Sequence, residues 1–345
     1  MSSLTYLKVA ASFDLLLLVF DYQDGVLHIH HPLRRVGSLA WDICPSSHAR
    51  LCSSMLEIDA ILSPWYKRHG TSRIRTFVRS TNAFRHNVVA CHAAYDGNIA
   101  VLRALLEATT HKCAEANLID WAACNGQLHV IEFLQEATDG RARCTPWAMD
   151  SAAKHGHVEV LKWLHHHRSE GCTTAAVREA ARNGHLHVLQ WLARHCICLW
   201  SDAMDLAAAN GRLAVVEWLH ESKRPCSTKA FIGAASNGHL KVVQWLDQHR
   251  SAYCTTDAMD GAAKNGHLDV VVWLHHNRRE GCTTAAMDGA ALRGHIQVLR
   301  WLATHRTEGF SKASTKTAKL NGQDNVVQVL RAHRKLAKPA SCIVQ

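Results

Sequence analysis

The sequence contains no apolar run long enough to form a membrane-spanning helix. An apolar run near the N-terminus covers only residues 15–20 and is flanked by Asp14 and Asp21, whereas a transmembrane helix needs about 20 apolar residues. Lys8 is the only basic residue before this run, and no small-residue cleavage pattern follows it. We therefore expect neither a membrane span nor a secretory signal peptide, and we interpret the run as a buried strand or helix of an N-terminal cap.

Signatures of the common enzyme classes are also missing. The sequence has no Gly-x-Gly-x-x-Gly, Gly-x-x-x-x-Gly-Lys-Ser/Thr, Gly-x-Ser-x-Gly or His-Glu-x-x-His. It therefore lacks the phosphate-binding loops, the nucleophile elbow and the helical zinc site that these motifs form. We predict a protein with no catalytic residues and no cofactor.

Glycine, in contrast, recurs with a nearly constant spacing of 27 to 30 residues. The nine glycines of this series are Gly97, Gly126, Gly156, Gly184, Gly211, Gly238, Gly266, Gly294 and Gly322. A period of this length is typical of stacked units that bury their apolar faces against their neighbours. The spacing predicts a repeat array with an extended surface in place of a catalytic pocket.

The unit from Cys254 to Glu280 shows the expected local structure. Thr255 and Thr256 offer an N-cap hydroxyl for a first helix over 257–264, and Asn265-Gly266 ends that helix. A second helix starts at His267, and Gly281 breaks the chain before the next unit. The sequence thus predicts an all-α solenoid of about nine helix–turn–helix units.

Two columns of residues explain how such units stack. An alanine pair, as in Ala262-Ala263, occupies one position of eight successive units and lets short helices approach closely. One tryptophan per unit forms the second column, which we interpret as packing between repeats: Trp163, Trp191, Trp218, Trp245, Trp273 and Trp301.

The recurring string Ala-Ala-x-Asn-Gly-His-Leu-x-Val-Val-x-Trp-Leu resembles the helix pair of the ankyrin repeat. The string recurs wholly or partly in nine units over residues 86–334. The period is shorter than the 33 residues typical of ankyrin repeats, so we expect shortened or absent β-hairpin fingers. The resemblance is to short-period, tryptophan-rich arrays of this family, and it implies a scaffold that binds a protein partner along a concave face.

The flanks of the array differ from the repeats. Residues 1–85 show no clear register and contain Pro32, Pro45 and Pro64; we interpret them as a helical capping segment, with helices over 53–62 and 73–84. Residues 335–345 are predicted to be a basic, flexible tail.

Cysteine and histidine are abundant, with 13 and 26 residues. Cys144, Cys172, Cys226, Cys254 and Cys282 recur one repeat apart, about 8–10 Å for packed helices, which is too far for a disulfide. We therefore expect thiols in a reducing, intracellular compartment, cytoplasmic or nuclear. The histidines after the turn glycines are likewise one repeat apart, so we predict a structural role for them and no metal site.

The candidate partner-binding residues lie on the first helices, at two positions that differ from unit to unit. Two residues before the alanine pair are Asp150, Arg178, Asp205, Asp260 and Asp288; one residue after it are Lys154, Arg182, Ser236, Lys264 and Leu292. In an ankyrin-like solenoid these helices line the concave face. We predict that this set binds a protein partner and that the chain is a monomer.

A basic ridge supplies the alternative function. Arg168, Lys223, Arg250, Arg278 and Arg306 each fall 12 residues after a turn glycine, in a chain of net charge +10. Such a ridge could bind nucleic acid or an acidic partner. Neutralisation of helix C-termini is the simpler explanation, so we place this function second.

Overall fold

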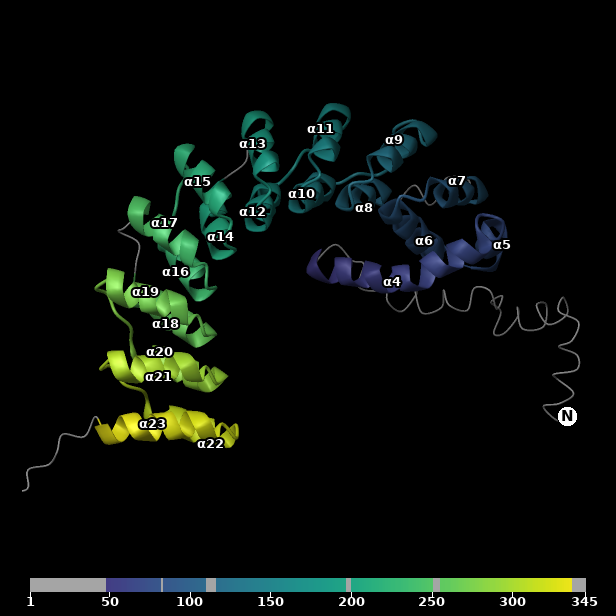
Figure 1. Cartoon of the computed structure of the whole chain (residues 1–345). Helices are drawn as coiled ribbons and strands as arrows, with labels where there is room; N and C mark the ends of the chain where they lie inside the picture. The colour runs from purple at the N-terminus through teal and green to yellow at the C-terminus, as the bar shows by residue number, and fades with distance from the viewer. Residues whose placement is uncertain (1–47, 82, 110–115, 197–199, 251–254, 337–345) are drawn as a thin grey trace, which may run out of the picture. The chain divides into compact units, whose positions relative to one another are not determined.

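The computed structural model describes residues 48–81, 83–109, 116–196, 200–250 and 255–336 (Figure 1). These residues form twenty α-helices and no β-strand, which confirms the predicted all-α class. Among these helices, none combines the length and the apolar composition that crossing a membrane requires. The apolar run at 15–20 and residues 337–345 of the predicted tail lie outside the described residues.

Nine helix pairs follow one another from residue 83 to residue 336. The first helices are α6 (Ala83–Asp96), α8 (Leu118–Cys124), α10 (Pro146–His155), α12 (Thr174–Asn183), α14 (Ala203–Ala209), α16 (Thr228–Ser236), α18 (Thr256–Asn265), α20 (Thr284–Arg293) and α22 (Lys312–Leu320). The second helices are α7 (Ile99–Ala108), α9 (Leu128–Ala137), α11 (Val158–His167), α13 (Leu186–His195), α15 (Leu213–Glu221), α17 (Leu240–Arg250), α19 (Leu268–Asn277), α21 (Ile296–His305) and α23 (Asp324–Leu336).

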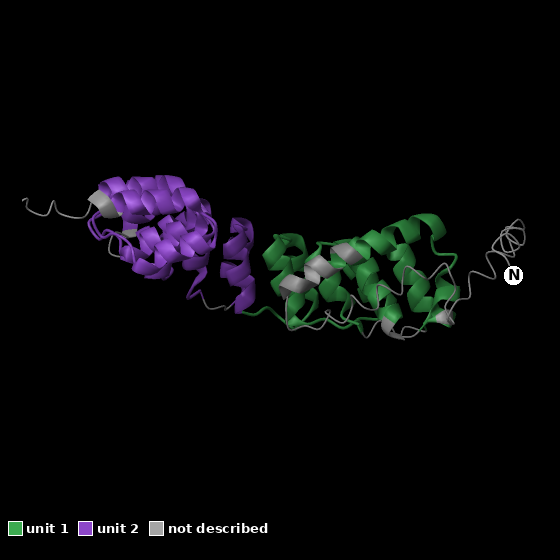
Figure 2. Ribbon diagram, turned by 90° about the horizontal axis from the view of Figure 1, so that it is seen from below, with its two compact units in different colours: residues 1–173 green, residues 174–345 purple. Residues whose placement is uncertain are grey.

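The chain divides into two compact units, residues 1–173 and 174–345 (Figure 2). Inside each unit, first helices pack on neighbouring first helices and second helices on neighbouring second helices, as α18 does on α20 and α19 on α21. Each unit is therefore a two-layer stack of helix pairs, as the solenoid prediction requires.

The turn between paired helices follows directly from the sequence. After α18, Gly266 adopts φ +86°, and its N–H donates to the Ala263 carbonyl at 3.1 Å. The N–H of His267 donates to the Ala262 carbonyl at 3.0 Å, which completes the two-bond helix ending that glycine favours. A Cβ on Gly266 would also lie 2.6 Å from Nδ1 of His295 in the next repeat. Both backbone conformation and inter-repeat packing therefore require glycine here.

The core lies between the two helix layers. Ala262 and Ala263 are fully buried, as are the alanine pairs of the other described repeats that carry one. In the tryptophan column only Trp191 is buried; it stacks on His195 of its own helix, with ring centroids 4.8 Å apart. Trp245 and Trp301 also meet the edges of His220 and His275 from the preceding second helix. The predicted packing between repeats is confirmed for these two tryptophans.

The N-terminal helices differ from the expected pieces. Helix α4 (His48–His69) continues through Pro64, because Ile58, Leu62 and Trp65 are buried on both sides of the proline and hold the helix against its neighbours. The expected single helix over 73–84 is interrupted: α5 covers Ile74–Ser80, and the next helix, α6, begins at Ala83. Between them Thr81 is extended, and its hydroxyl donates to the Phe77 carbonyl at 2.6 Å, which ends α5.

Candidate functional site

Aspartates of the first helices bind the start of the following repeat. Oδ1 of Asp150 accepts the backbone N–H of Thr173 at 2.8 Å, and Oδ2 accepts the Thr173 hydroxyl at 2.6 Å. Asp205 holds the N–H and hydroxyl of Ser227 in the same way, at 2.9 and 2.5 Å. The series, which we call the aspartate clamps, also includes Asp120–Thr145, Asp260–Thr283 and Asp288–Ser311, the last joined by Ser314.

The clamps give four of the candidate partner-binding residues a packing role. The carboxylates of Asp150, Asp205, Asp260 and Asp288 are engaged within the chain, and Asp150 and Asp205 are only 8% exposed. Sequence reasoning did not single out Asp120, which is the most buried member at 1% exposure. The sequence pattern that could have identified Asp120 is the Thr or Ser that lies 22 to 25 residues after each clamp aspartate.

The repeats that begin with α12 and α16 depart from the clamp. Arg178 replaces the aspartate on α12, and its Nε lies 2.9 Å from a carboxylate oxygen of Asp202 at the start of the next repeat. This ion pair also links a first helix to the start of the following repeat, but here the carboxylate belongs to the following repeat. On α16 the position is Ile232, which is half-buried and offers no acceptor.

The turn residues form a second link between repeats. The carbonyl of Ala209 accepts the side-chain amide of Asn237 at 2.7 Å, and that of Ser236 accepts the amide of Asn265 at 2.6 Å. These carbonyls lie at helix ends, where no backbone donor of the same helix is available. The Asn-Gly-His turn thus completes the end of the preceding first helix.

The second candidate column is more open than the aspartate column. Lys154 and Ser236 are half-buried, and Arg182 forms an ion pair with Glu179 of its own helix at 2.6 Å. Lys264 packs its Cβ and Cγ beside Gly289 but is exposed overall. Leu292 is 50% exposed. Lys264 and Leu292 are therefore the exposed members of this second column.

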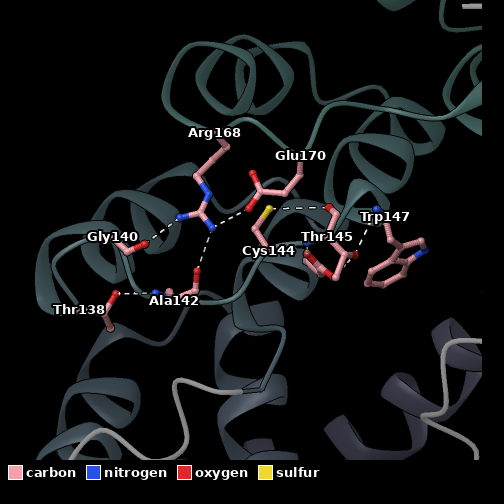
Figure 3. A network of polar contacts seen from close by, with 9 residues as sticks. Thr138, Gly140, Ala142, Cys144, Thr145, Trp147, Arg168 and Glu170 are labelled. Atoms are coloured by element: carbon pink, nitrogen blue, oxygen red, sulfur yellow. Dashed lines mark hydrogen bonds and ion pairs between the residues drawn. The ribbon is translucent and has the colours of Figure 1, made fainter.

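Three arginines of the basic ridge bind groups of the protein's own loops and helices. The Arg168 guanidinium donates to the carbonyls of Gly140 and Ala142, each at 3.0 Å, and to Glu170 at 2.8 Å (Figure 3). The Arg168 side chain is only 13% exposed. It joins the loop before α10 to the loop after α11, so its charge is neutralised within the chain.

The other ridge residues whose side chains the structure describes are either paired or exposed. Arg278 forms ion pairs with Asp247 at 2.7 Å and Glu280 at 3.0 Å. Arg306 pairs with Glu308. Lys223 is exposed, with φ +55°, and Arg250 is the last residue of α17. The three paired arginines act as C-caps of their helices, but their side chains bind loop groups beyond the helix ends.

Three side chains near Arg168 have shifted pKa values. Burial raises the pKa of the Cys144 thiol to about 12, and the nearby carboxylates of Asp120 and Glu170 add to the shift. Burial also raises the pKa of Asp120 to about 6, against the hydrogen bonds from Thr145. Burial alone would raise the pKa of Glu170, but the hydrogen bond and charge of Arg168 and the backbone N–H groups of Ser169 and Glu170 together outweigh burial and lower that pKa. Cys144 is therefore a protonated thiol at neutral pH and a poor nucleophile.

The described cysteines and histidines show no arrangement for metal chemistry. Seven cysteines in the described part of the chain are thiols. Within the same residues, no three His, Cys, Asp or Glu side chains are grouped to hold a metal ion. His239 shows what the turn histidines do: its ring lies against Gly211 of the preceding repeat and binds the backbone of Ala209.

The comparison with protein families agrees with the geometry. Residues 149–193 match the family model of ankyrin repeats that occur in many copies, which supports the ankyrin-like interpretation of this part of the chain. No curated protein matches the sequence.

Proposed function

We propose that this ankyrin-like repeat protein is a non-catalytic scaffold that binds a protein segment on the first helices of its repeats. Ankyrin repeats generally mediate protein–protein interaction. One observation carries the proposal: the polar groups that recur from unit to unit are used in holding repeats together, whereas Lys264 and Leu292 vary in type and remain exposed.

The chemistry of the loops supports a binding role over a catalytic one. The hollow beside Arg168, of about 450 Å³, is lined by Cys144, Thr145 and Glu170. Its one thiol has a raised pKa, and the Thr145 hydroxyl donates to Asp120 at 2.6 Å. A nucleophilic site needs a lowered pKa or an adjacent free base. The pKa of the thiol is raised, and the Asp120 carboxylate beside the Thr145 hydroxyl already accepts the Thr145 N–H as an aspartate clamp.

The test is a partner pull-down with charge-reversed first helices. Lys154→Glu, Arg182→Glu and Lys264→Glu are combined in one full-length variant. The matched control reverses Lys162, Lys241 and Arg300, which lie on second helices. We expect the first variant to lose the partner and the control to retain it, with equal helicity in circular dichroism.

A contrary result would redirect the proposal. Equal retention by both variants would exclude the first-helix surface. Binding of random duplex DNA, with an affinity that falls steeply with salt, would favour the basic ridge, because phosphate contacts release counterions.

A further inference from the structure

Two leucines are exposed at equivalent positions of adjacent repeats. Leu292 on α20 is 50% exposed and Leu320 on α22 is 77% exposed, and they are the large apolar side chains exposed in the described part of the chain. Each occupies the position one residue beyond the alanine-pair slot, and α20 packs on α22. From these equivalent positions on packed helices we expect the two side chains to be neighbours on the first-helix surface of the unit 174–345.

The surroundings of these leucines are basic. Lys264 occupies the equivalent position on α18, and Lys316 and Lys319 lie on α22; all three are exposed. They form no ion pair with any residue that the structure describes. We call Lys264, Leu292, Lys316, Lys319 and Leu320 the Leu–Lys patch.

The acidic residues on the same helices do not neutralise the patch. Asp260 and Asp288 face the following repeat, where they accept hydrogen bonds from Thr283 and from Ser311. Asp257 lies at the other end of α18, in its first turn, and accepts the Thr255 hydroxyl. The exposed lysines near the two leucines can therefore form ion pairs with a partner.

We infer that the Leu–Lys patch binds a segment of a partner protein that carries two aliphatic side chains flanked by aspartate or glutamate. This inference rests on the proposed scaffold function and gives the partner its chemistry. Neighbouring exposed apolar side chains with a polar rim mark contact sites, and charge complementarity selects an acidic partner over a basic one.

The repeat geometry sets the spacing of the two aliphatic residues. Equivalent positions on packed helices lie about 8–10 Å apart. A segment in the polyproline II conformation returns to the same face every three residues and covers about 9 Å in that length, and a helical segment covers about 10 Å in seven residues. The partner should therefore place its aliphatic side chains at i and i+3 if it binds in the polyproline II conformation, or at i and i+7 if it binds as a helix.

The experiment selects peptides from a displayed random library against the full-length chain and measures their affinities for variants. Leu292→Ser combined with Leu320→Ser removes the apolar contacts, and Lys316→Glu combined with Lys319→Glu reverses the charge. Lys241→Glu with Arg300→Glu is the matched charge control on second helices. All substituted residues are exposed, so unchanged circular dichroism and urea midpoints are expected.

The expected result is a set of acidic peptides with one of the two aliphatic spacings. Both patch variants should weaken their binding at least about tenfold, while the control leaves it unchanged. Loss of binding in the lysine variant should be smaller at high salt, because screening already weakens the attraction.

Three outcomes would overturn the inference, and they bear differently on the scaffold function. Selected peptides that bind the patch variants normally, but not a variant that combines Lys154→Glu with Arg182→Glu, would refute the patch and keep the first-helix surface. Peptides that no first-helix variant affects would refute both proposals. Self-association that disappears in the leucine variant would show that a second copy of the chain occupies the patch.

Discussion

The aspartate clamp at Asp205 allows a quantitative test of how repeats are joined. Asp205→Ala removes the acceptors of the Ser227 N–H at 2.9 Å and of its hydroxyl at 2.5 Å. Hydrogen bonds to a charged group contribute about 1.5–3 kcal/mol each, and the Ser227 hydroxyl can turn toward water after the change. We therefore expect α16 to lose about 2–4 kcal/mol of local stability. Asp205→Asn keeps one carbonyl acceptor and should cost roughly half as much.

The assay is native-state hydrogen exchange at the first turn of α16, because repeat arrays need not unfold in a single two-state transition. The expected loss corresponds to exchange that is about 30- to 900-fold faster at these amides. Asp269→Ala is the matched control, since Asp269 is exposed in the first turn of α19 and its interaction with the helix dipole contributes at most about 1 kcal/mol. Equal acceleration in the two alanine variants would refute the clamp as a link between repeats.

The repeat architecture could be predicted because its signals are local. The ending of α18 at Gly266 depends on a glycine φ and on two backbone bonds to the adjacent alanine pair. A short string therefore carries the whole turn, and the predicted helix over 257–264 differs from the observed Thr256–Asn265 by one residue at each end. The path of α4 through Pro64 depends on tertiary packing, which the local pattern does not contain.

The roles of charged side chains were harder to predict because their partners are distant in sequence. The Asp150 carboxylate meets Thr173, 23 residues later, and an isolated column of aspartates does not reveal whether it faces solvent or a neighbouring repeat. Arg168 binds the carbonyls of Gly140 and Ala142, and backbone acceptors leave no trace in composition. The Glu two residues after Arg168 was the available signal for an internal ion pair.

The sequence identified only part of the Leu–Lys patch. Lys264 and Leu292 stand out because their position varies between repeats whose other positions are fixed. Leu320 was missed because Lys319 replaces the second alanine of its repeat, which obscures the equivalence with Leu292. Only the exposed fractions of the two leucines bring them together.

Three further measurements test the packing and the electrostatics. Because burial raises the pKa of Asp120 from 3.8 to about 6, the folded state binds this proton more tightly than the unfolded chain. The free energy of unfolding should therefore fall as pH rises from about 4 to about 6, and urea midpoints should show a flatter profile in Asp120→Asn. Since burial raises the pKa of Cys144 to about 12, alkylation at this site should be slow in the folded protein. Thiol counting in urea should return all 13 cysteines with or without prior reductant. Several disulfides would contradict a reducing compartment. Finally, Gly266→Ala and Gly309→Ala both place a side chain at positive φ, +86° and +75°, but only at Gly266 would the new Cβ meet another group, 2.6 Å from Nδ1 of His295. Backbone strain of about 1–2 kcal/mol is common to both variants, and displacement of the His295 ring should cost Gly266→Ala about 1–3 kcal/mol more in urea denaturation. Equal losses of unfolding free energy in the two variants would mean that backbone conformation alone requires the turn glycine. The contact between Gly266 and the His295 ring would then not hold adjacent repeats together.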